Sequence, residues 1–150
     1  MGCDIHLHSE VKRGGKWLHH SEQKVERNYP LFAKMGEQNR NDSGIIPISK
    51  PKGIPEDATE LTKLHVEKYG VDGHSHSWLN AKEISELHKF IKDPDNPKEW
   101  FHGRYGDRLM WSHDNLPYFM GNHLNGFFDY PEDWEDTGIE DVRYVIFFDN

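Results

Sequence analysis

The sequence predicts an α+β fold in one domain spanning residues 1–150, the size of a single folding unit. Three observations support this class. Residues 3–11 alternate apolar and polar side chains, as a half-buried strand does, and residues 80–93 have apolar side chains at helical spacing. Residues 141–149 are apolar on both faces, which is typical of a central strand. We therefore expect a mainly antiparallel sheet with an N-terminal hairpin, a central C-terminal strand and two or three helices.

Residues 3–23 predict the hairpin. The apolar face of its first strand consists of Cys3, Ile5, Leu7 and Val11. The other face is polar, because successive side chains point to opposite sides of a strand. Gly14 and Gly15 suit a two-residue turn. Such a turn pairs Glu10 with His19 and places His19 on the polar face.

Three segments predict helices. NYPLFAKM has Pro30 at a first-turn position, and NAKEISELHKFIKD begins with a capping box between Asn80 and Glu83. EDATELTKLHVEKYG ends at Gly70. The face that we expect this second helix to bury consists of Ala58, Leu61, Leu64 and His65. Residues 94–138 have no clear period but many aromatic side chains, which predicts short strands and long, packed, aromatic-rich loops.

Composition excludes several classes of function. Nineteen aromatic residues, namely 5 Trp, 6 Tyr and 8 Phe, indicate a folded chain although only 35% of residues are hydrophobic. A net charge of −8 disfavours binding to extended nucleic acid. The apolar runs are too short to cross a membrane. A single cysteine, Cys3, excludes an intrachain disulfide and favours a reducing, cytoplasmic compartment.

The chain has 11 histidines, and four of them form two His-x-His pairs at residues 6–8 and 74–76. Residues two apart on a strand point to the same side, so each pair can bind one metal ion. Mixed nitrogen and carboxylate ligands suit a divalent transition metal, namely zinc, manganese or iron. The candidate ligands are Asp4, His6, His8, Glu10, His74 and His76. The alternative is that these residues form solvated strand faces.

The DIHLHS stretch resembles the first metal motif of the PHP phosphoesterase superfamily, in which a strand-borne His-x-His binds a metal cluster. This resemblance implies that His6 and His8 are metal ligands. It implies neither the barrel fold of that superfamily nor its further ligands, because the chain lacks the length and the β/α alternation of a barrel.

A second resemblance extends over nearly the whole chain. MGCDIH, RNYPLFAKM, ISKPKGIPED, DGHSHSWLNAKEI, GNHLNGF and EDVRYVIFFDN together resemble a family of small uncharacterised proteins found in bacteriophage and bacterial genomes. The resemblance implies a phage-type accessory protein in the bacterial cytoplasm, of the kind that acts on host metabolism or on defence signals. It implies no mechanism.

The HSHSWLN stretch leads directly into the best-capped predicted helix, whose free N–H groups attract anions. An aromatic side chain here can stack on a base, and two arginines elsewhere can clamp a phosphate or carboxylate. The candidate residues for a small anionic or nucleotide ligand are Ser75, Ser77, Trp78, Asn80, Arg27 and Arg143. The alternatives are an ordinary helix cap and ordinary salt bridges.

Two hypotheses for function follow, from different classes. In the first, the protein is a metal-dependent hydrolase that acts on a small phosphorylated or nucleotide substrate. In the second, it is a non-catalytic binder that sequesters a small anionic or nucleotide signal of host defence. A structural role in a phage assembly is a third reading, and the oligomeric state, a homo-oligomer included, stays open.

Overall fold

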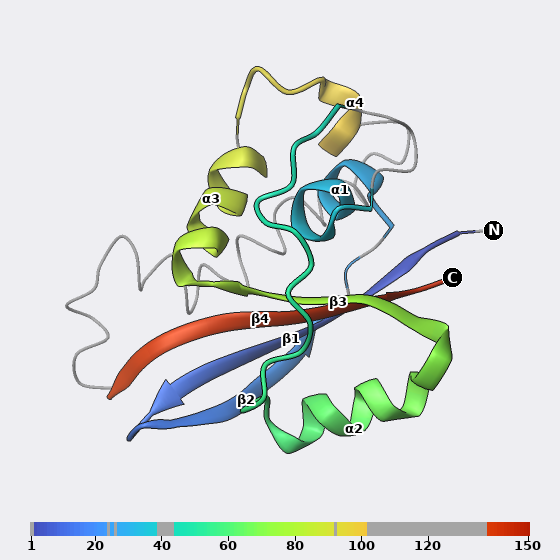
Figure 1. The fold of residues 1–150 in the computed structure, drawn as a ribbon. Helices are drawn as coiled ribbons and strands as arrows, with labels where there is room; N and C mark the ends of the chain where they lie inside the picture. The colour runs from blue at the N-terminus through green and yellow to red at the C-terminus, as the bar shows by residue number, and fades with distance from the viewer. Residues whose placement is uncertain (1, 24, 26, 39–43, 92, 102–137) are drawn as a thin grey trace.

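A computed structural model describes residues 2–23, 25, 27–38, 44–91, 93–101 and 138–150, and it confirms the predicted α+β class. A four-stranded antiparallel sheet has the order β2-β1-β4-β3 (Figure 1). The strands are β1 (Asp4–Arg13), β2 (Lys16–Gln23), β3 (Gly73–Asn80) and β4 (Ile139–Asp149). The helices are α1 (Tyr29–Gly36), α2 (Glu60–Tyr69), α3 (Ala81–Ile91) and α4 (Lys98–Phe101), with a 3-10 turn, η1, at Gly70–Asp72.

The predicted hairpin is confirmed. Gly14 and Gly15 both have positive φ, 59° and 74°, as a two-residue turn of type I′ requires. Glu10 pairs with His19 as expected. Beyond this pair the register shifts between Ser9 and Glu10, so that Ser9 pairs with Ser21. The shift is a β-bulge, and it changes which side chains of β2 face each side of the sheet.

The C-terminal strand β4 is central, as expected, with β1 on one side and β3 on the other. Its alternating side chains divide the sheet into two faces. The face toward α1 and α3, here called the core face, includes Tyr144, Ile146 and Phe148. The face toward α2, here called the histidine face, includes Phe147, whose ring contacts His65 of α2, and Val145, two residues before it on β4.

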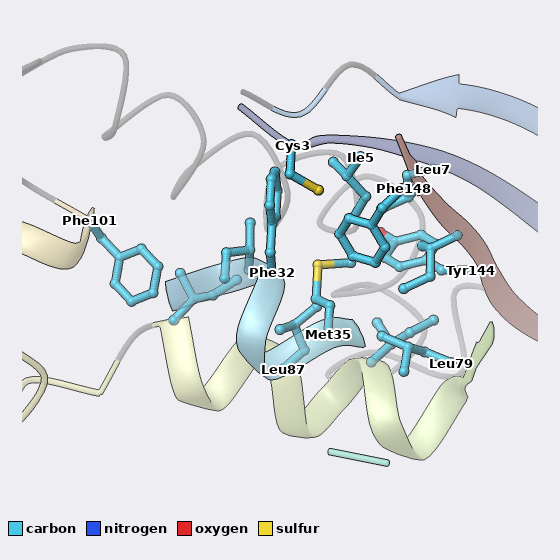
Figure 2. Packing of buried hydrophobic residues seen from close by; sticks show 14 of the residues in the cluster. Cys3, Ile5, Leu7, Phe32, Met35, Leu79, Leu87, Phe101, Tyr144 and Phe148 are labelled. Carbon is cyan, nitrogen blue, oxygen red and sulfur yellow. The ribbon is translucent and has the colours of Figure 1, made fainter. Parts of the chain in front are cut away.

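The main apolar core lies between the core face and the two helices α1 and α3 (Figure 2). Phe32 and Met35 of α1 and Leu87 of α3 pack against Phe148 and its neighbours, and all are fully buried. The capping box of α3 is confirmed, because the Glu83 N–H donates to Asn80 Oδ1 at 2.9 Å and the Asn80 N–H donates to Glu83 Oε1 at 3.1 Å.

Helix α2 covers the histidine face, and the prediction of its buried side was right for Ala58 and His65 and wrong for the two leucines. Leu61 and Leu64 are 58% and 52% exposed, whereas Thr62 is fully buried. The reason is that α2 docks through polar contacts. The Thr62 hydroxyl donates to the buried carboxylate of Glu10, and His65 meets the histidines of the sheet.

Segment 44–59 connects α1 to α2 around the β3 edge of the sheet (Figure 1). The Gly53 N–H donates to the His76 carbonyl at 2.9 Å, which ties the segment to that edge. The expectation for residues 94–138 falls mostly outside the described part of the chain. Within that part, no helix is both long enough and apolar enough to span a membrane.

Candidate metal centre

The histidine face contains imidazoles from both strands of the β1–β2 hairpin and from α2. His6 and His8 point to this face because they alternate with the buried Ile5 and Leu7 along β1. Helix α2 lies over the same face and adds His65 (Figure 1). Strand β2 adds its own polar side chains. The cluster consists of His6, His8, His19, Glu22 and His65.

Three members of this cluster have the geometry of metal ligands. His6, Glu22 and His65 each offer one ligand atom, and these three atoms lie within 4.8 Å of one another. Around a tetrahedral zinc ion the ligand atoms are about 3.3 Å apart, so a small adjustment would complete the site. The side chains of His6 and His65 are mostly buried and that of Glu22 is half exposed. His6 and His65 are therefore packed against the rest of the protein, whereas Glu22 leaves the group open to solvent.

Glu22 reaches this face because of the bulge at Ser9. An unshifted hairpin would pair Glu22 with Leu7 and turn its carboxylate to the core face. The observed register pairs it with His8 instead. One extra residue in β2 therefore places a carboxylate beside the imidazoles of β1.

His8 lies at the buried centre of the cluster, only 3% exposed. Its Nε2 is 2.7 Å from His65 Nδ1, and its Nδ1 is 2.9 Å from His19 Nε2. Burial, followed by the proximity of His65, lowers the pKa of His8 to about 4. Burial also lowers the pKa of His65. Both rings are therefore neutral at pH 7, which is the form that binds metals.

His6 has an acidic partner on β4. Its Nε2 lies 2.5 Å from Asp149 Oδ2. When Nε2–H donates to this carboxylate, the ring keeps a free lone pair on Nδ1. A carboxylate behind an imidazole is the usual outer support of a metal-binding histidine. The His6 ring also stacks on Phe147 with centroids 4.7 Å apart, so its orientation is fixed from two sides.

Glu10 is held by hydrogen bonds from neighbouring side chains and is fully buried. Its Oε1 accepts from Arg143 Nε at 2.7 Å, and its Oε2 accepts from the Thr59 and Thr62 hydroxyls at 2.6 and 2.8 Å. Arg143 also donates to Asp57 Oδ1 at 2.8 Å. Glu10 and Arg143 thus have partners within the protein, and their roles as metal ligand and anion clamp stay predictions.

The expectation that His74 and His76 share a face was wrong. Ser75 has φ +55°, and the register of β3 on β4 shifts between His74 and Ser77. The bulge turns His74 to the core face, where its ring stacks over Phe148, and leaves His76 on the histidine face, stacked on Phe147. The second His-x-His pair cannot hold one ion between its two rings.

Asp4 and Arg27 pair with each other beside the cluster. Arg27 Nε donates to Asp4 Oδ1 at 2.6 Å and Nη2 to Oδ2 at 3.1 Å, and both side chains are about half exposed. The hydrogen bond from Arg27 is the main cause that lowers the pKa of Asp4, and His6 adds to it. The guanidinium is therefore tied to Asp4, two residues before His6 on β1.

The residues predicted for an anion site at the start of α3 have other partners. Ser75 lies in the bulge, and its hydroxyl accepts a hydrogen bond from the side-chain amide of Gln38, which follows α1. The buried Ser77 hydroxyl accepts the Lys52 N–H at 3.1 Å. The Lys52 ammonium covers the Trp78 ring at 3.9 Å from its centroid, and Asn80 caps the helix. These contacts hold segment 44–59 against β3.

Comparison with protein-family models, curated proteins and solved structures gives no match to this chain.

Proposed function

We propose that the protein binds a divalent transition metal through His6, Glu22 and His65 and uses it to hydrolyse a small phosphorylated or nucleotide substrate. The observation that carries this proposal is the convergence of their three ligand atoms within 4.8 Å. The three residues come from β1, β2 and α2, so folding has to bring them together.

The donor set favours zinc, iron or manganese over magnesium or calcium, because two of its three atoms are imidazole nitrogens. Two histidines and one carboxylate leave coordination positions for water and substrate, as in catalytic sites. A metal bound there would supply a hydroxide at neutral pH and polarise a phosphoryl oxygen.

Arg27 supports the choice of an anionic substrate. Its guanidinium is half exposed and held in a fixed orientation by Asp4, which lies two residues before His6 on the same strand face. A fixed guanidinium is well suited to bind a phosphate oxygen. The net charge of −8 disfavours anions elsewhere, so recognition would be local.

The test of metal binding is elemental analysis of protein purified without a histidine tag. We expect about one equivalent of metal in the wild type and in His74→Ala, and loss of the metal in His65→Ala. His74 is the matched control, since it is a histidine on the opposite face. Less than stoichiometric metal in wild-type protein supplemented with zinc, iron or manganese would overturn the proposed site.

The test of hydrolysis follows on the metal-loaded protein. Phosphate release from nucleotides and from an aryl phosphate should stop with chelator and resume when metal is added back. Arg27→Ala should raise KM more than it lowers kcat, because Arg27 is proposed to bind substrate. A loaded protein that releases no phosphate from any of these substrates would contradict the hydrolase assignment.

A further inference from the structure

We propose that His8 and His19 are positioning residues, which fix the orientation and the tautomer of the metal ligand His65 through a chain of imidazole hydrogen bonds. This inference rests on the metal site proposed above. It concerns a different question, namely which ring nitrogen of His65 is free to bind the ion.

The chain runs through three rings. His65 Nδ1 lies 2.7 Å from His8 Nε2, and His8 Nδ1 lies 2.9 Å from His19 Nε2. His65 Nδ1 is 3.7 Å from Glu22 Oε1, which is beyond hydrogen-bond distance, so His8 is its closer partner. Each contact needs one N–H and one lone pair. A neutral imidazole offers one of each, so both hydrogen bonds must be donated in the same direction along the three rings.

A metal selects that direction. Because His65 Nδ1 lies 2.7 Å from His8 Nε2, the nitrogen of His65 that is left for an ion is Nε2. An ion there would leave the proton on Nδ1, which would donate to His8 Nε2. His8 then carries its proton on Nδ1 and donates to His19 Nε2. In the opposite direction His19 donates to His8, His8 donates to His65 Nδ1, and the proton on His65 Nε2 blocks metal binding. The position of one proton in each ring therefore decides whether His65 is competent.

The environment of His8 suits this role. His8 is buried beneath α2, and both of its ring nitrogens face another imidazole, so its ring has little freedom to turn. His6, the other histidine ligand, has an equivalent support in Asp149. Each imidazole of the proposed site thus has an outer hydrogen-bond partner, and loss of such partners commonly weakens metal binding 10- to 100-fold.

Zinc affinity of His8 variants tests the proposal, measured by competition with a chromophoric chelator. We expect His8→Leu to weaken binding about 10- to 100-fold, since leucine has no acceptor for His65 Nδ1–H. His8→Gln should stay within about threefold of wild type, because its amide oxygen reaches the position of Nε2 and still accepts. His74→Leu is the matched control and should bind as wild type does.

A second readout reports the tautomers directly. In ¹⁵N NMR spectra of the imidazoles, zinc should drive both His8 and His19 to the Nδ1–H form. In His19→Leu, which alters a less buried ring, His8 should still take the Nδ1–H form when zinc binds, because His65 Nδ1–H still donates to His8 Nε2, whereas the preference of His8 without zinc should be lost. This variant keeps the proposal testable if His8→Leu does not fold.

Three results would overturn the proposal. His8→Leu could fold and bind zinc as tightly as wild type, or His8 could carry its proton on Nε2 in the zinc-bound protein. His8→Gln could also bind as weakly as His8→Leu, which would make His8 itself a ligand. A wild type that binds no zinc, iron or manganese is a different outcome, because it removes the metal site as well.

Discussion

Glu10 of β1 and Arg143 of β4 form an ion pair with Oε1 and Nε 2.7 Å apart and both side chains buried. Removing the charge of Glu10 leaves the buried guanidinium of Arg143 with only the exposed carboxylate of Asp57 as a counter-charge. We expect Glu10→Gln to lower the free energy of unfolding by about 3–5 kcal/mol, measured by urea denaturation. Asp57→Asn is the matched control, since its exposed carboxylate contacts the same arginine. Asp57→Asn should lower the free energy of unfolding by no more than about 1 kcal/mol. Equal decreases in the two variants would contradict the expectation that the buried pair contributes more than the exposed one.

The capping carboxylate of α3 should make stability depend on pH. Burial alone would raise the pKa of Glu83, but hydrogen bonds from Lys52 and the Asn80 N–H outweigh it, so the pKa lies below its usual value. A depressed pKa contributes stability that is complete above the unfolded pKa of about 4.3 and is lost as pH falls through the folded pKa.

Glu83→Gln is the variant that checks this dependence. The difference between its free energy of unfolding and that of wild type should be constant between pH 7 and about pH 5 and should shrink below about pH 4. Urea denaturation at several pH values measures it. A difference that does not change with pH would show that the carboxylate charge makes no contribution.

Gly36 allows the end of α1 to approach β4 closely. A Cβ atom at this position would lie 2.4 Å from Phe148 Cε2, and Phe148 is fully buried. Glycine to alanine in a helix usually stabilises, yet here we expect Gly36→Ala to destabilise by about 1–3 kcal/mol through overpacking. Thermal unfolding measures the loss. The double variant Gly36→Ala, Phe148→Leu should recover part of it, and a more stable single variant would refute the close contact.

Metal binding should hold α2 to the sheet. Of its ten residues only Thr62 is buried, and the helix is docked mainly by polar contacts to β1 and β2. An ion shared by His65, His6 and Glu22 would link the helix to both strands. We expect zinc to slow amide hydrogen exchange in α2 and to leave α3 unchanged. His65→Ala should abolish the effect, and equal protection of α2 and α3 would point to a general stabilisation instead.

Local patterns predicted the strands and helices well, because each depends on a short repeat. The alternation of Ile5 and Leu7 with His6 and His8 fixes the two faces of β1, and Asn80 with Glu83 marks the start of α3. These features need only neighbouring residues. The sequence therefore predicted the hairpin, the capping box and the central position of β4 correctly.

The candidate site was predicted only in part, because single-residue bulges change the phase of a strand. The bulge at Ser9 turns Glu22 toward the histidines, and the bulge at Ser75 separates His74 from His76. Neither has a clear local signal, since each depends on pairing with a distant strand. His65 was expected on a buried helix face together with Leu61 and Leu64. Those two leucines are exposed, and His65 instead contacts polar residues of the sheet.

The order of strands in the sheet has a consequence for how the protein is made. Within the described ranges, β2 pairs only with β1 and β3 only with β4, so the β1–β4 pair joins two halves that are far apart along the chain. Glu10 and Arg143 are 133 positions apart, and such distant contacts form slowly. On the ribosome, β1 must wait for β4 to emerge before its neighbour is present. His6 gains Asp149 only at that stage, so the outer support of this proposed ligand would be complete only after β1 and β4 have paired.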